Sequence, residues 1–221
     1  MTTLQLADNL YPSLHMDDSV GHALQLMNEF KTTHLPVVAD EKFLGIIGAD
    51  DLMNEKNKKT KLEVYQTNFL PAAVNSDLYF LKAASISNLY PTNFIAVIND
   101  KNDFIGTISS KSLSLALGNF SGTSEFGALI VLEMEHARFA LAEINSIVES
   151  DGATILHMNV SMHSTTKDLW EVTLQINKKE VATIIATFER YDYSIIYYSG
   201  EELFENETTI NYNNLMNYLA I

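Results

Sequence analysis

Short apolar runs separated by polar turns dominate the first half of the chain. Residues 35–38 predict a strand, residues 40–42 a polar turn, and residues 43–47 a returning strand. Asp50 then occupies the expected N-cap of a helix, with Asp51 in the first turn. Such a strand-to-helix junction points unpaired backbone N–H groups at whatever lies beside it. Taken alone, the two acids are explained by helix capping.

The same pattern recurs in residues 95–113. Leu35 corresponds to Ile95 at an offset of 60 residues, and Gly45 corresponds to Gly106 at an offset of 61 residues. A single residue inserted in a loop explains the difference, because loops tolerate insertions. The chain before residue 120 is therefore predicted to be a tandem duplication of one supersecondary unit.

These repeats resemble the CBS domain family, which occurs as tandem pairs. The resemblance rests on the motifs Leu-Pro-Val-Val-x-Asp and Gly-Ile-Ile-x-x-x-Asp-Leu in the first repeat. It covers residues 5–118, with repeats at about 5–58 and 62–118. The resemblance implies that the two repeats pack through their sheets and leave clefts for an adenosine-type ligand such as AMP, ADP or ATP.

The nucleotide motif of that family has a Ser or Thr after the glycine and an acid three residues later. The first repeat has Gly48 at the hydroxyl position and keeps the acid as Asp51, whereas the second repeat has Ser109 and then Ser112. Each motif therefore lacks one part. Three interpretations remain: one weak site, a different ligand, or a pair of repeats kept only for its fold and dimer surface. His34 either faces a ligand phosphate or packs at the surface. The candidate ligand-binding residues are Val37, Val38, Asp51, Val97, Thr107, Ser109 and Ser112.

Helical spacing of apolar residues predicts two longer helices in this half, at residues 17–31 and at about 76–89. The expected buried positions of the first are Val20, Ala23, Leu24, Met27 and Phe30. Those of the second are Leu78, Leu81, Ala84 and Ile86.

Residues 118–124 are small and polar and predict a domain boundary. The expected elements after it are strand 126–134, helix 137–149, strand 153–162, a hairpin turn at 163–167, strand 169–176, helix 178–190 and strand 193–198. The order βαββαβ is typical of a ferredoxin-like domain. The whole chain is therefore predicted to be an α+β protein with domains at 1–120 and 121–200 and a tail at 201–221.

Residues 126–199 resemble an ACT domain, both in topology and in the sequence Leu141-Ala142-Glu143-Ile144. Small-molecule sites of that family use a glycine where Phe139 stands here. A phenylalanine prevents the close backbone approach that glycine permits, so packing or dimerisation is expected in preference to amino-acid binding. In the tail, a short helix over 212–219 is expected to dock on the chain or on a second subunit.

Composition narrows the function classes. The net charge of −14 argues against unaided binding to nucleic acid or to an anionic membrane surface. The chain has no cysteine, which excludes disulfides and thiolate chemistry. No signal peptide or long apolar segment is evident, so a cytoplasmic location is expected.

No catalytic constellation is recognisable, and the chain is not expected to be an enzyme. His136, His157 and His163 could together form a metal site, but their spacing is wider than that of most metal sites, and none is expected. The leading hypothesis is a regulatory or sensor protein that acts as a homodimer on an unidentified protein partner. The alternative is a structural dimerisation module with degenerate ligand sites.

Overall fold

The computed structural model describes residues 1–122, 126–162 and 168–199. The chain divides into two compact units, residues 1–117 and 118–221. The hairpin turn expected at 163–167 and the tail helix expected at 212–219 lie outside the described residues. No helix within the described part is long and apolar enough to cross a membrane.

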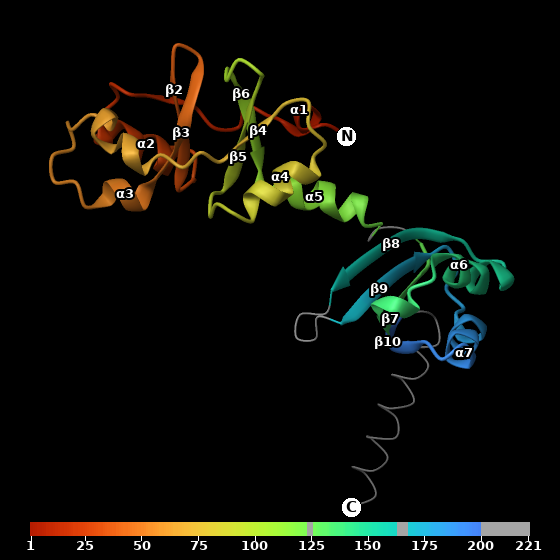
Figure 1. Cartoon of the computed structure of the whole chain (residues 1–221). Helices are drawn as coiled ribbons and strands as arrows, with labels where there is room; N and C mark the ends of the chain where they lie inside the picture. Colours follow the sequence, from red (N-terminus) through yellow and green to blue (C-terminus); the bar gives the residue numbers. More distant parts are fainter. Residues whose placement is uncertain (123–125, 163–167, 200–221) are drawn as a thin grey trace, which may run out of the picture. The chain divides into compact units, whose positions relative to one another are not determined.

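The first unit contains the duplicated supersecondary unit that the sequence predicts (Figure 1). The elements of its first repeat are α1 (Thr3–Leu6), β1 (Leu14–His15), α2 (Val20–Glu29), β2 (His34–Ala39), β3 (Lys42–Gly48) and α3 (Ala49–Met53). Those of the second are the 3-10 helix η1 (Leu62–Asn68), β4 (Ala73–Asn75), α4 (Leu81–Ser87), β5 (Phe94–Ile98), β6 (Phe104–Ser109) and α5 (Ser110–Phe120).

Each repeat forms a three-stranded sheet, in the orders β1-β2-β3 and β4-β5-β6. In both sheets the first pair of strands is parallel and the second antiparallel. The first hairpin turns through Asp40 and Glu41, which have φ angles of 46° and 67°. The residue that changes the repeat offset from 60 to 61 lies in the equivalent hairpin of the second repeat. Val38 pairs with Phe43 in the first hairpin, whereas Ile98 pairs with Phe104 in the second, whose connection is one residue longer.

The two repeats exchange backbone hydrogen bonds through their entry segments. Asp8, ahead of β1, pairs with Thr107 of the second repeat through two N–H···O bonds of 2.8 Å. Leu70, ahead of β4, pairs in the same way with Ile46 of the first repeat at 2.8 and 2.9 Å. The entry segment of each repeat therefore lies alongside the last strand of the other, and the repeats form one compact unit.

Glycine makes room for these crossing segments. A Cβ atom on Gly106 would lie 2.6 Å from the carbonyl oxygen of Asp8, and one on Gly45 would lie 2.6 Å from Cβ of Phe69. Gly45 also has a φ of +153°. A side chain at either position would push the crossing segment away from the sheet.

Two expected helices differ from the prediction in their burial. In α2, Ser19 caps the N-terminus by accepting from His22 N at 3.1 Å, and Met27 is buried as expected, but Phe30 is 41% exposed. Phe30 follows the last helical residue, so the helical spacing no longer holds there. In the second repeat the helix begins only at Leu81.

The later start of α4 changes which side chains reach the core. Phe80 and Ala83 are buried, whereas Leu78 is 43% exposed and Leu81 is 37% exposed. The prediction of Leu78 and Leu81 as core positions was wrong. The backbone is not helical before Phe80 because Asp77 and Leu78 form a turn on Asn75, whose side-chain oxygen accepts from the Asp77 N–H.

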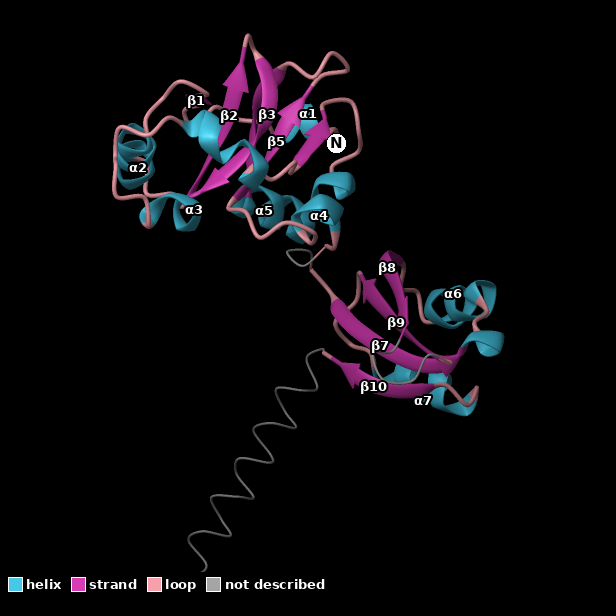
Figure 2. Cartoon of the chain, turned by 60° about the vertical axis from the view of Figure 1, so that its left-hand side comes forward, coloured by secondary structure: helices cyan, strands magenta, loops and turns pink. Residues whose placement is uncertain are grey.

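The second unit has the βαββαβ order of a ferredoxin-like domain. Its elements are β7 (Ala128–Glu135), the 3-10 helix η2 (His136–Arg138), α6 (Leu141–Ser150), β8 (Ile155–Met162), β9 (Leu169–Ile176), α7 (Ala182–Arg190) and β10 (Ser194–Tyr198). The four strands form an antiparallel sheet in the order β10-β7-β9-β8, and α6 and α7 lie on one face of it (Figure 2).

The core of this unit follows the predicted apolar positions closely in α7. Val181, Ile184, Ile185 and Phe188 are all buried, as the helical spacing predicts. The helix expected at 137–149 is instead divided, because Ala140 has an extended backbone between η2 and α6. Its interior positions Ile144 and Val148 are buried as expected, but Leu141 is 53% exposed. Phe139, which stands at the glycine position of the ACT pattern, packs against the core from the boundary.

Tyr193, which precedes β10, contacts both helices of the C-terminal unit. The Tyr193 hydroxyl donates to Oε1 of Glu143 at 2.7 Å, and its ring stacks edge-on against Phe188. Burial, followed by the hydrogen bond to the Glu143 carboxylate, raises the pKa of Tyr193 to about 12. The neutral phenol is therefore the form that the fold stabilises.

We expect Gly106→Ala to destabilise the N-terminal unit, because the new methyl group displaces the Asp8 carbonyl and breaks the crossing pair. The expected loss in free energy of unfolding is about 1–3 kcal/mol, as for other overpacked sites. Denaturant unfolding measures it, with Lys111→Ala on the exposed face of α5 as the control. A Gly106→Ala protein as stable as that control would show that the crossing is not tightly packed.

We expect Tyr193→Phe to cost about 1–2 kcal/mol at neutral pH through loss of the hydrogen bond to Glu143. The raised pKa in the folded state means that the contribution of the phenol is complete below pH 10, its ordinary pKa, and is lost as the pH rises towards 12. The stability difference between wild type and variant should therefore narrow over that range. Tyr197→Phe, at a half-exposed tyrosine, is the matched control, and a gap that stays constant with pH would contradict the assignment.

Candidate functional site

Two equivalent strand-to-helix junctions lie in the N-terminal unit, at β3–α3 and at β6–α5. In the first, the N–H of Ala49 donates to the carbonyl of Thr33 at 2.8 Å, and in the second the N–H of Ser110 donates to the carbonyl of Asn93 at 2.9 Å. Each helix start is thus anchored to the residue that precedes the first long strand of its own repeat. The duplication therefore fixes both junctions in the same backbone geometry.

The first junction differs from the prediction in its cap. The N-cap residue is Gly48, with an extended backbone and no side-chain cap, so the prediction of Asp50 as the N-cap was wrong. Strand β3 runs directly to Gly48 and α3 begins at the next residue, which places both acids in the first turn of the helix. Asp50 is exposed and Asp51 is half-buried.

The carboxylate of Asp51 is held from one side. Its Oδ1 accepts from Nδ2 of Asn68 at 2.8 Å. A Cβ atom on Gly48 would lie 3.3 Å from Oδ2 of Asp51 and 3.5 Å from Nε2 of His34. The absence of a side chain at Gly48 therefore lets the carboxylate and the imidazole both lie close to the backbone of the junction.

His34, on the other side of Gly48, contacts the second repeat. Its Nδ1 lies 2.9 Å from Oγ1 of Thr33 and 3.2 Å from Oδ1 of Asn93, and the Thr33 hydroxyl also donates to that oxygen at 3.1 Å. We call these five residues, Thr33, His34, Asp51, Asn68 and Asn93, the polar cluster. It draws on both repeats, and Asn68 comes from η1 at the start of the second.

At the second junction, β6–α5, the two serine side chains bond to each other. Oγ of Ser109 lies 2.8 Å from Oγ of Ser112 and accepts from the Ser112 N–H at 3.0 Å. Ser109 is 7% exposed. The structure thus brings these two predicted residues together as a helix cap, with their polar atoms bonded to each other.

Four other predicted residues lie in the interior. Val37 and Val97 have no exposed surface and belong to the apolar cores of the first and second repeat. Thr107 is also fully buried, and its hydroxyl donates to Oδ1 of Asp8 at 3.0 Å. Val38 is 5% exposed. In this structure the valines support the sheets, and Thr107 supports the crossing segment.

Sequence analysis missed Thr33, Asn68 and Asn93 as members of the cluster. The repeat offset of 60 residues, which relates Leu35 to Ile95, also relates Thr33 to Asn93 and was a usable signal. Asn68 had no such signal, because it reaches Asp51 only through the crossing of Leu70 onto Ile46.

The chemistry of the polar cluster is that of a site for hydroxyl groups. An ionised carboxylate is an acceptor only, and it pairs well with the hydroxyls of a diol. None of the five residues is a lysine or arginine, so the cluster offers no permanent cation to a phosphate. Among the described residues, no group of three or more His, Asp or Glu side chains is placed to hold a metal ion.

Comparison with known proteins identifies the first repeat. The family model described as CBS domain matches residues 10–58. A CBS domain pair/ACT domain protein from Thermotoga maritima is similar to 54% of this chain over 98% of its own length, at 15% identity and a TM-score of 0.50. The CBS domains of a transcriptional regulator from Streptococcus pneumoniae match 52% of this chain over 98% of their own, at 13% identity and a TM-score of 0.46. A search of the curated proteins found no sequence match.

These findings confirm the first repeat as a CBS domain, and the likeness to the Thermotoga maritima structure shows the fold of a CBS domain pair.

We expect Ser109→Ala to destabilise the N-terminal unit by about 1 kcal/mol, because the variant loses the acceptor that caps α5. Thermal or denaturant unfolding measures the loss. Ser114→Ala, at an exposed position in the same helix, should change stability by less than about 0.5 kcal/mol. Equal stability of the two variants would show that Ser109 does not act as the cap.

Proposed function

We propose that the N-terminal unit is a regulatory module that binds one adenosine-type ligand, with the ribose diol on the Asp51 carboxylate. Proteins with CBS domains are commonly regulatory and not catalytic. The observation that carries the proposal is the placement of Asp51: one carboxylate oxygen is fixed by Asn68, and the other lies beside Gly48, which has no side chain, at the start of α3. A preoriented carboxylate loses little entropy when it accepts a ligand hydroxyl.

A single site follows from the difference between the two junctions. Asp51 offers a charged acceptor, whereas at the equivalent place Ser109 and Ser112 already satisfy each other. Opening that pair would cost a hydrogen bond without providing a carboxylate in return. One ligand per chain is therefore the expected stoichiometry.

The charge of the protein favours a ligand with few phosphates. The net charge is −14, and the polar cluster contributes no lysine or arginine. Each added phosphate increases repulsion from the overall field without gaining a paired cation. We infer the affinity order AMP above ADP above ATP, with no cofactor required for folding.

Regulation would arise because the polar cluster spans both repeats. A ligand that contacts Asp51 of the first repeat and Asn93 of the second favours whichever relative position of the repeats brings the two side chains to it. The C-terminal unit, which we propose to be ACT-like, would relay that change or hold a homodimer. The regulated partner would then be a protein, in a cytoplasmic setting, with no role for nucleic acid or membrane.

The second candidate is a structural dimerisation module without a ligand. The burial of Val37, Val97 and Thr107 favours it, because three of the predicted contact residues are occupied by the fold. On this alternative, substitution of Asp51 changes local helix energetics only.

Asp51→Ala should weaken binding of AMP by about tenfold to a hundredfold, as expected for loss of hydrogen bonds to a charged acceptor. Isothermal calorimetry with adenosine, AMP, ADP, ATP, NAD and S-adenosylmethionine measures affinity and stoichiometry. The matched control is Asp50→Ala, which removes the neighbouring acid from the same first turn of α3 and has the same effect on the helix dipole.

Equal weakening by Asp50→Ala and Asp51→Ala would show that helix electrostatics, and not a ribose contact, governs binding. Binding of two AMP molecules per chain would contradict the inference that the hydrogen bond between Ser109 and Ser112 prevents a second site. If no compound of the panel gives heat or a thermal shift at millimolar concentration, the sensor proposal fails and the structural module stands.

A further inference from the structure

A separate pocket of about 550 Å³ lies in the C-terminal unit, where β7 passes into η2 beside the start of β9. It is lined by Glu135, His136, Ala137, Asp168 and Trp170. The backbone closes its base, because the N–H of His136 donates to the carbonyl of Asp168 at 3.4 Å. All of these groups belong to the C-terminal unit.

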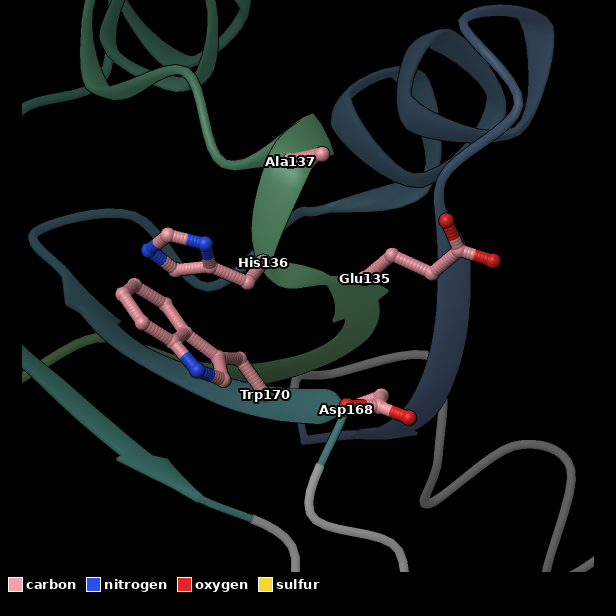
Figure 3. A pocket seen from close by; sticks show the side chains of 5 residues that line it. All are labelled: Glu135, His136, Ala137, Asp168 and Trp170. Atoms are coloured by element: carbon pink, nitrogen blue, oxygen red, sulfur yellow. The ribbon is translucent and has the colours of Figure 1, made fainter.

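One wall of the pocket is aromatic. The rings of His136 and Trp170 meet with centroids 4.2 Å apart at an angle of 62°. Phe139 supports the indole from behind, with ring centroids 5.4 Å apart. In Figure 3 the two lining rings project to the same side of the strand ends. The indole is half-buried, and this packing holds it in place.

The other wall is acidic. Glu135 and Asp168 are both exposed, and Figure 3 shows their carboxylates on the side opposite the two rings. The strands that lead to the pocket add charge of the same sign, because the register sets Glu133 opposite Glu171. The potential at this end of the sheet is therefore negative.

No lysine or arginine lines the pocket in the part of the chain that the structure describes. The basic residue that follows in η2, Arg138, is directed elsewhere. Its guanidinium donates to the carbonyls of Tyr191 and Asp192 at 3.3 and 3.1 Å and stands over the ring of Tyr193. Glu135 and Asp168 therefore line the pocket without a basic partner from η2.

We propose that this pocket binds an organic cation: an amine or guanidinium group carried on an apolar or aromatic body. The cationic group would lie towards Glu135 and Asp168, and the apolar body would lie against the indole of Trp170. Carboxylates supply charge-assisted acceptors for N–H donors, and an indole offers a broad apolar surface to the body of the ligand. A neutral compound of the same shape keeps only the contact with the indole, and an anion is in addition repelled by the carboxylates.

The chain contains a built-in reporter for this proposal, because Trp170 is its only tryptophan. Titration of the full chain with 2-phenylethylamine, followed by selectively excited tryptophan fluorescence, should give a saturable change. The uncharged 2-phenylethanol and the anionic 3-phenylpropionate have similar apolar bodies and should bind about tenfold more weakly or not at all. Added salt should weaken the amine response.

The double variant Glu135→Gln, Asp168→Asn keeps the reporter and removes the acidic wall. It should lower the affinity for the amine about tenfold, to the level of the alcohol. Glu149→Gln, at an exposed position in α6, is the matched control and should leave the affinity unchanged. All substituted positions are exposed, and thermal unfolding checks that each variant is folded.

Equal affinity for amine and alcohol, an amine affinity that the double variant retains, or no saturable response at millimolar concentration would each overturn the proposal. The test is independent of the adenosine ligand. Asp51→Ala, which removes the ribose acceptor in the other unit, should leave the amine titration unchanged.

Discussion

The N-terminal unit depends on the exchange of entry segments between its repeats. A three-stranded sheet with one helical face is too small to bury its apolar side chains alone, and the crossing of Asp8 onto Thr107 and of Leu70 onto Ile46 joins two such sheets through paired backbone bonds. Both crossings pass over the sheet beside a glycine. The need for close backbone approach therefore restricts these positions more strictly than any ligand would.

The same exchange also assembles the candidate site. Leu70 pairs with Ile46, two residues before Gly48, and this pairing brings the preceding Asn68 to the Asp51 carboxylate. A residue from the connection between the repeats thus positions an acid of the first repeat. Because the polar cluster is a product of the crossing, a change in the relative position of the repeats alters its geometry directly.

The sequence was sufficient where local pattern and tertiary structure agree. Duplication, hairpins, the βαββαβ order and the buried face of α7 all follow from periodicity and turn chemistry, and the structure confirms them. The prediction was wrong where a turn or an extended residue makes a helix begin later than the apolar spacing indicates. This occurs at the turn before Phe80 and at the extended residue Ala140. It also missed Asn68, since no local pattern encodes a contact that depends on a crossing strand.

The two junctions show why fold and chemistry must be argued separately. Their backbones are equivalent, yet one pairs Gly48 with Asp51 and the other pairs Ser109 with Ser112. The serine pair caps its helix and satisfies its own polar atoms. The glycine junction leaves its helix without a side-chain cap and keeps a carboxylate beside the buried Gly48. A purely structural role would favour the capped arrangement in both repeats, so the uncapped junction is the one at which a ligand would compensate for the missing contact.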